Sequence, residues 1–225
     1  MLARRLETCG LGSKIKYVPY ETAYTSSATW TVPHTQWYEI HVVGAGGAGG
    51  KGGGGGEGLQ NYWYYSGGSG GGGGSGGHTA GQYLLTEGTN IPLIVGSSES
   101  VFGASSDDFY MRVLSGKNGG AGTHASLSSM TEGSAGSGGS KGTVSSAGNL
   151  SVSSTGNKGR DGRDGKSGSG SSGSSIVVSG GAGGPSPYGG YGAGGTGGTG
   201  TVTSRGGTGG DGGSGAVVIT AYQQE

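Results

Sequence analysis

Short segments in which apolar and polar residues alternate are spread along the chain, separated by long stretches rich in glycine. The segment WYEIHVV (37–43) places Tyr38, Ile40 and Val42 on one face, and GAVVITAYQ near the end of the chain repeats this pattern. A period of two is typical of a β-strand with one buried face. These segments predict a small antiparallel β-sandwich or sheet, made of residues 28–43, 81–96, 108–114, 175–179 and 216–222.

Glycine recurs at every third position in the stretches between the predicted strands. In VVGAGGAGGKGGGGGEG (42–58), two of the three registers are all glycine after the leading valines, and GGSGGGGGSGG (67–77) keeps the same pattern. Residues 206–215 repeat it, whereas 133–142 and 156–168 keep glycine in a single register. A repeat of three matches an extended left-handed helix with three residues per turn.

Such a helix forms no hydrogen bonds within itself, yet buried backbone N–H and C=O groups need partners. Neighbouring helices can supply those partners if glycine faces let the backbones approach closely. We therefore predict a bundle of short polyglycine-II helices, with two-register stretches inside it and single-register stretches at its edges. The predicted fold class is all-β plus polyglycine-II: a small antiparallel β-sandwich base, a bundle of glycine-rich left-handed helices, and loops at the far tip.

Two other uses of glycine fit the sequence less well. Gly44, Gly46 and Gly49 match the spacing of a dinucleotide-binding turn, but each further glycine costs a helix about 1 kcal/mol, so the required helix cannot follow. A collagen triple helix needs abundant proline, and the chain has five prolines, none of them in GNKGRDGRDGKSG (156–168). Trimerisation of that last segment stays open as an alternative.

Composition narrows the functional classes. Glycine makes up 62 of the 225 residues and the formal net charge is zero, so the chain has no basic footprint for nucleic acid. The regular glycine spacing and the low net charge argue against disorder. A lone cysteine, Cys9, excludes an internal disulfide, and no stretch is apolar enough to cross a membrane. The first residues also lack the continuous apolar core of a signal peptide.

The chain divides into two predicted regions. Residues 1–24 are poor in glycine and basic, and we predict a docking or flexible segment there. Residues 25–225 are predicted to form a single glycine-rich domain. Within it, the segments 59–66, 123–132 and 184–192 are rich in residues that a glycine lattice cannot use, so they are expected as loops at the far tip.

Several short pieces of sequence occur in a distinctive order. They are WTVPHTQWYEIHVVGAGGAGG, a strand pair ending in IVG, LSGKNGGAG (114–122) and GGSGAVVITAY (212–222). In this order, which covers residues 28–222, the chain resembles the glycine-rich tail proteins of bacteriophages, including the small adhesins that cap long tail fibres. The resemblance implies a polyglycine-II sandwich with host-recognising loops at its distal tip and attachment through the N-terminal region.

The resemblance also implies partners and a location. The partners would be a tail fibre or tail-tip protein of the virion and a host surface polysaccharide or outer-membrane protein, without nucleic acid or membrane insertion. The location would be the virion, after synthesis in the host cytoplasm. The short N-terminal segment departs from the adhesins, which leaves a structural tail-tip, baseplate or collar component as the alternative.

The strongest candidate for ligand binding is the aromatic cluster between two glycine stretches, because flat aromatic side chains stack on sugar rings and supply contact area at low entropic cost. A second candidate is the pair of tyrosines beside Pro185 and Pro187. For the first group the competing interpretation is that it covers the end of the bundle, and for the second that it forms a rigid turn. The predicted ligand-binding residues are Tyr62, Trp63, Tyr64, Tyr65, Tyr188 and Tyr191.

No arrangement of nucleophile, base and orienting group is recognisable, so we expect no enzymatic activity, no cofactor and no metal. GGTGGD (206–211) matches one unit of a calcium-binding repeat, and one unit without its partners is a poor site. The histidines have no metal-ligand spacing; they are His34, His41, His78 and His124. An ice-binding glycine bundle is a further alternative that fits Thr196, Thr199 and Thr208, but the bulky tyrosines argue against it.

Overall fold

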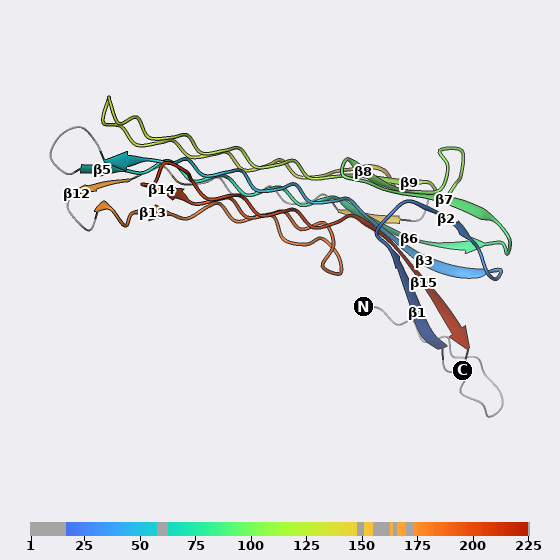
Figure 1. Cartoon of the computed structure of the whole chain (residues 1–225). Helices are drawn as coiled ribbons and strands as arrows, with labels where there is room; N and C mark the ends of the chain where they lie inside the picture. Colours follow the sequence, from blue (N-terminus) through green and yellow to red (C-terminus); the bar gives the residue numbers. More distant parts are fainter. Residues whose placement is uncertain are drawn as a thin grey trace.

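The computed structural model describes residues 17–57, 63–147, 151–154, 163, 166–169 and 173–224. This part of the chain is all-β, with antiparallel sheets and essentially no helix, as predicted. The molecule is long and narrow (Figure 1). Two larger sheets lie at one end, the base, and glycine-rich stretches, the stem, run from them to a second end, the tip.

Two five-stranded sheets form the base. The first has the order β1 (Tyr17–Tyr24), β15 (Ala216–Gln224), β3 (Gln36–Val43), β6 (His78–Leu85) and β11 (Ser151–Ser154). The second has the order β10 (Val144–Ala147), β9 (Met111–Leu114), β8 (Glu99–Phe102), β7 (Asn90–Val95) and β2 (Ala28–Thr31). All neighbouring strands in both sheets are antiparallel.

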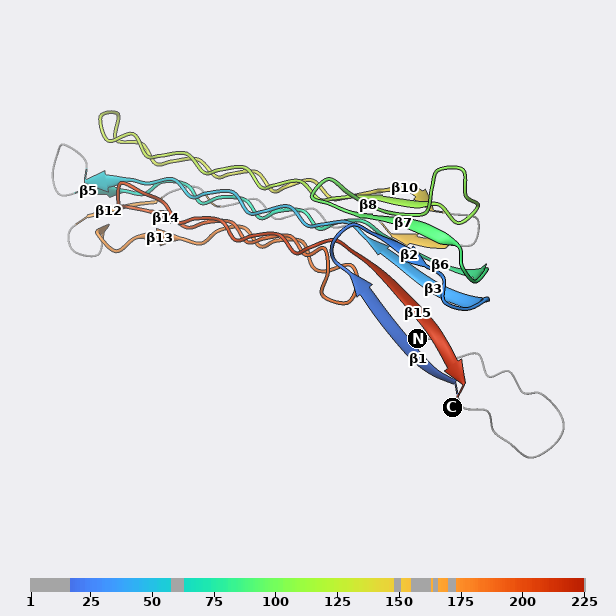
Figure 2. The same ribbon diagram turned by 45° about the vertical axis from the view of Figure 1, so that its right-hand side comes forward.

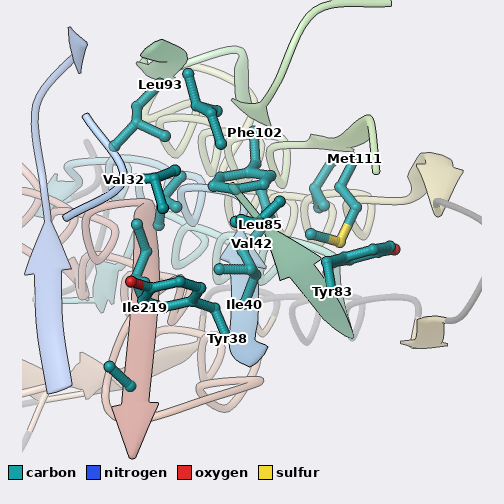
Figure 3. Packing of buried hydrophobic residues seen from close by; sticks show 14 residues of the cluster. Val32, Tyr38, Ile40, Val42, Tyr83, Leu85, Leu93, Phe102, Met111 and Ile219 are labelled. Carbon is teal, nitrogen blue, oxygen red and sulfur yellow. The ribbon is translucent and has the colours of Figure 1, made fainter. Parts of the chain in front are cut away.

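The alternating segments build the core of the base. Ile40 and Val42 of β3 are buried in one cluster with Leu93 of β7 and Phe102 of β8 (Figure 3). Each large apolar side chain buried in this way stabilises the fold by about 1.5–3 kcal/mol. The buried cluster consists of Val32, Tyr38, Ile40, Val42, Tyr83, Leu85, Ile91, Leu93, Phe102, Met111, Val113, Val217, Ile219 and Ala221.

Residues 66–77 are the centre of the stem, and all of them are buried. The register that begins at Gly68 donates backbone hydrogen bonds to residues 114–123, and the register that begins at Gly67 donates to residues 192–201. The N···O distances are 2.8–3.2 Å. Backbone hydrogen bonds therefore run sideways between stretches, at every third residue. The carbonyl oxygens of this central stretch accept hydrogen bonds from residues 44–53, 133–142 and 181–184.

Close approach explains why both registers are glycine. A Cβ at Gly70 would lie 2.0 Å from the carbonyl oxygen of Gly50, and one at Gly71 would lie 2.0 Å from that of Ser137. Real Cβ atoms essentially never approach another heavy atom within 3.0 Å, so neither position accepts a side chain. The third register carries Ser66, Ser69 and Ser75, all fully buried, whereas a Cβ at Gly72 of the same register would lie 2.1 Å from the Ala182 carbonyl oxygen.

Residues 133–142, with one glycine register, lie at an edge of the stem. The glycines of this register are buried and donate to the central stretch, as in Gly136 N–H to Ser69 O at 2.9 Å. Ser134, Ser137 and Ser140 are exposed. This is the position expected for a stretch with a single glycine face.

Small sheets form the tip. One has the order β12 (Ser167–Ser169), β5 (Trp63–Tyr65) and β4 (Gly56–Glu57). The other pairs β13 (Val177–Val178) with β14 (Gly200–Thr201). Figures 1 and 2 both place these sheets at the end of the stem opposite the base.

The predicted boundary after residue 24 is wrong. Residues 17–24 form β1, which pairs with β15 from Tyr17 opposite Gln224 to Tyr24 opposite Val217. This pairing uses the edge of β15 that faces away from β3. The first sixteen residues of the predicted N-terminal segment lie outside the described residues.

The predicted place of 175–179 in the base is also wrong. Ser169 pairs with Trp63 at the tip, so the chain is already at that end when it reaches Val177. It returns toward the base only afterwards, as Gly181 bonds to Gly70 and Gly184 to Gly73. β10 and β11 are strands that the sequence interpretation missed, because their serine-rich sequences show little apolar alternation.

The loop at 184–192 lies near the base and not at the tip. Gly184 bonds to Gly73 and Gly76 bonds to Gly192, at the end of the central stretch that leads into β6. The turn between these residues must therefore lie at this end of the stem, as Figure 1 shows. Of the predicted tip loops, 123–132 is at the tip, and so is the described part of 59–66 (Figure 2).

Candidate functional site

The tip carries the aromatic strand β5 at the centre of its three-stranded sheet. Tyr65 lies opposite Gly56 on one side and Ser167 on the other. Trp63 is 43% exposed, whereas Tyr64 and Tyr65 are half-buried. The sheet thus holds the backbone of this strand in place and leaves the indole ring of Trp63 accessible to a partner.

Of the other aromatic residues predicted in this loop, Tyr64 has a described side-chain contact and Tyr62 does not. The Tyr64 hydroxyl donates to Glu57 Oε2 at 3.4 Å, which links β5 to β4 through side chains. Tyr62 lies outside the described residues. The structure therefore brings Trp63, Tyr64 and Tyr65 together on one strand, and ligand binding by any of them stays a prediction.

A turn over residues 125–132 lies beside this sheet. Ser126 and Thr131 exchange backbone hydrogen bonds of 2.9 and 3.0 Å across the turn. A Cβ at Gly56 would lie 3.0 Å from Leu127 Cδ1, so Leu127 packs against β4. Met130, at the outer part of the turn, is 40% exposed.

Exposed apolar side chains from separate segments therefore gather at the tip. Besides Trp63 and Met130, Val177 of β13 is 60% exposed. Single exposed apolar residues are common on protein surfaces, so none of them marks a site alone. These three share a position at the far end of a hydrogen-bonded stem, whereas the other exposed large apolar residues lie on strands of the base: Tyr20, Trp37, Leu84, Ile94 and Tyr222.

A second cluster lies at the base, on the face of the first sheet that points away from the core. His41 Nδ1 and His78 Nε2 are 3.0 Å apart, so one ring donates to the other. His41 Nε2 lies 3.2 Å from Glu39 Oε1. The Tyr188 ring stacks on His41 at a centroid distance of 4.0 Å and an interplanar angle of 15°.

Tyr188 is held over the histidines by a tight turn. The Ser186 hydroxyl donates to the carbonyl oxygens of Tyr188 and Tyr191, and Tyr191 N–H donates to Tyr188 O at 2.9 Å. Gly189 and Gly190 have positive φ values of 56° and 87°, which side-chain-bearing residues rarely adopt. The rigid-turn interpretation of Tyr188 and Tyr191 therefore has direct geometric support, and ligand contact by these residues stays a prediction.

The environment keeps both histidines neutral. Burial lowers the pKa of His78 to about 4, and the neighbouring His41 adds to this lowering. Burial also lowers the pKa of His41, although the Glu39 carboxylate opposes that shift. With neutral rings, His41 Nε2–H donates to Glu39 and His78 Nε2–H donates to His41 Nδ1. If both rings were imidazolium cations, each would carry a hydrogen at the shared 3.0 Å contact, so this geometry excludes the doubly charged pair.

Sequence reasoning predicted the loop at 123–132 and singled out Tyr188, but it did not find the contact of His41 with His78 or a role for Leu127 and Met130. His41 and His78 are 37 positions apart, and only the pairing of β3 with β6 brings them together. Leu127 and Met130 stand in a serine-rich segment without a distinctive pattern. Among the described residues, no three His, Cys, Asp or Glu side chains are grouped so that they could hold a metal ion. The same residues contain no helix of the length and apolar character needed to cross a membrane.

Comparison with known proteins gives no further guide. No protein-family model matches the chain, and no curated protein matches it.

Proposed function

We propose that the stem is a bundle of polyglycine-II helices and that the protein is a bacteriophage tail adhesin. The period of three in the glycines and the sideways hydrogen bonds at every third residue support the first part. In this conformation residues 44–55 would span about 37 Å, at about 3.1 Å per residue. Glycine chemical shifts measured by NMR should give φ near −75° and ψ near +145°. Sheet-like values would contradict this part of the proposal.

The observation that carries the adhesin function is the exposed Trp63 on a paired strand at the end of the stem. A stem with dense sideways bonding limits the motion of its tip. Binding groups that are already fixed lose little conformational entropy when a partner docks. The receptor site would comprise Trp63, Tyr64 and Tyr65, together with Tyr62 of the same loop, and the receptor would be a host surface polysaccharide or outer-membrane protein. Tyr188 and Tyr191 lie at the opposite end and fall outside this site.

The base would attach to a tail fibre or tail-tip protein of the virion. Trp37 of β3 and Leu84 of β6 lie opposite each other in adjacent strands, and each is 57% exposed. Paired exposed apolar side chains of this kind suit a protein contact. The two ends of the molecule would then have separate roles, with attachment at the base and host recognition at the tip.

The test is binding of the purified, fluorescently labelled protein to a panel of bacterial strains. We expect binding to a subset of strains, and Trp63→Ala should weaken it by about tenfold or more. Trp37→Ala is the matched control, because it removes an exposed indole from the opposite end and should leave cell binding unchanged. Equal effects of the two substitutions would contradict the assignment of the receptor site to the tip.

The alternative role is a structural tail-tip, baseplate or collar component without receptor contact. It predicts that the wild-type protein binds no strain and that particles lacking it fail to assemble. The adhesin role predicts particles that assemble but do not adsorb, so the two outcomes separate the proposals.

A further inference from the structure

Met130 is the one described residue other than glycine with a positive φ, at 51°. Glycine or asparagine adopts this left-handed conformation more readily than a residue with a long side chain. A strained residue persists only when the surrounding structure fixes it, and such residues concentrate at binding and catalytic sites. The choice of methionine at this position therefore needs a reason other than backbone conformation.

Hydroxyl groups inside the turn fix the backbone around Met130. The Ser129 and Ser126 hydroxyl groups are hydrogen-bonded to each other, and Ser129 Oγ lies 3.2 Å from Thr131 Oγ1. The backbone bonds between Ser126 and Thr131 close the turn from the other side. All of these hydrogen bonds are made by hydroxyl groups and backbone groups of the turn.

Leu127 is the residue that packs against β4, whereas Met130 is 40% exposed. Because β4 pairs with β5, the turn is anchored beside the strand that carries Trp63. The turn that carries Met130 and the strand β5 that carries Trp63 therefore lie at the same end of the molecule (Figure 2).

We propose that Met130 is a receptor-contact residue and that it inserts into an apolar pocket on a protein of the bacterial surface. This inference rests on the proposed adhesin function. A thioether side chain has no hydrogen-bond donor and is only a weak acceptor, so it offers little to the hydroxyl groups of a polysaccharide. It is unbranched and polarisable, and it fits irregular apolar pockets well. These properties favour a protein over a sugar chain as the partner of this turn.

The test compares Met130→Gly and Met130→Leu with the wild-type protein on a strain that the wild-type protein binds. Met130→Gly relieves the strain, so its thermal unfolding midpoint should equal or exceed that of the wild-type protein, while binding to cells should fall by about tenfold. Met130→Leu keeps an apolar side chain of similar size and should retain most of the binding. Treating the cells with protease should abolish binding, whereas periodate oxidation of surface sugars should not.

The outcomes separate this inference from the proposed function. If Met130→Gly binds like the wild-type protein while Trp63→Ala does not bind, Met130 is not a contact residue and the adhesin function stands. If periodate abolishes binding and protease does not, the receptor is a polysaccharide and the inferred partner class is wrong. If the wild-type protein binds no strain, the adhesin function and this inference fall together.

Discussion

Replacing Gly70 with alanine tests whether close backbone contact holds the stem together. The new Cβ would lie 2.0 Å from the carbonyl oxygen of Gly50, whereas ordinary contact begins at 3.4 Å. The two stretches must therefore separate locally by about 1.4 Å, the difference between these distances. The neighbouring hydrogen bond from Gly50 N–H to Gly71 O would lengthen from 2.8 Å to about 4.2 Å and would be lost.

The loss leaves a buried donor and a buried acceptor without partners, at about 1–3 kcal/mol each. Alanine also restricts the unfolded chain, which returns about 0.4–1 kcal/mol. We therefore expect the free energy of unfolding to fall by about 1–6 kcal/mol. Urea unfolding followed by tryptophan fluorescence measures this change, and amide exchange of residues 66–77 locates it.

Gly96→Ala is the matched control for this experiment. A Cβ at Gly96 would meet only the Glu99 carbonyl oxygen, at 3.6 Å, which is an ordinary contact, and its φ does not lie in the positive range. This substitution should leave stability unchanged or raise it by about 0.4–1 kcal/mol. If Gly70→Ala were as stable as Gly96→Ala, close packing of the stem would not be a source of stability.

The other predictions concern the base. The free energy of unfolding should decrease by about 1–2 kcal/mol when the pH falls from 6.5 to 4. The half-buried His78 has a pKa of about 4 in the folded protein, so the unfolded chain binds more protons in this interval. In urea titrations, His78→Gln should make the free energy of unfolding less dependent on pH. Tyr188→Ala removes the ring stacked on His41 and His78 and should lower the free energy of unfolding by about 1–2 kcal/mol. It should also raise the pKa of His78, as an NMR titration would detect, whereas Tyr188→Phe should keep the stability and the pKa of the wild-type protein. An unchanged His78 pKa in Tyr188→Ala would contradict a role of Tyr188 in shielding His78 from water. Arg112→Met removes the ion pair between β9 and β8, in which Arg112 Nε donates to Glu99 Oε2 at 2.7 Å. Because this pair is partly exposed, the loss of unfolding free energy should stay below about 1 kcal/mol and be smaller in high salt. Thermal unfolding at two salt concentrations measures both effects.

Local patterns in the sequence were sufficient for the parts of the fold that depend on local geometry. The alternation in 37–43 and 216–222 correctly predicted β3 and β15, and the two segments around Gly88 correctly predicted β6 and β7. The all-β antiparallel character followed from the same signal. β1 shows a weaker form of it, since Tyr20 and Tyr24 alternate with Glu21 and Ala23, but most of this strand is exposed and the apolar contrast is small.

The position of the loops could not be predicted in the same way. The location of 184–192 depends on whether the preceding stretch runs toward the tip or toward the base. A repeat of glycine at every third position is the same for both directions, so the sequence does not predict the direction. The pairing of His41 with His78 depends on the register between β3 and β6. The left-handed conformation of Met130 depends on a turn whose hydrogen bonds come from common serine and threonine residues. Each of these features follows from the arrangement of segments and not from the composition of any one of them.

The third register of the stem offers a physical explanation for that arrangement. Backbone bonds between glycine faces are nearly equivalent, so they favour association without choosing which stretches become neighbours. Side chains of the third register are not equivalent: Asn118 Oδ1 accepts from Ala48 N–H at 2.9 Å, and His124 Nδ1 accepts from Gly54 N–H at 3.1 Å. The two acceptors are six residues apart, as are the two donors, so both bonds form together only when the stretches are paired in one register. Glycine thus supplies the cohesion of the stem, while a few polar side chains at its surface select the neighbours and their alignment.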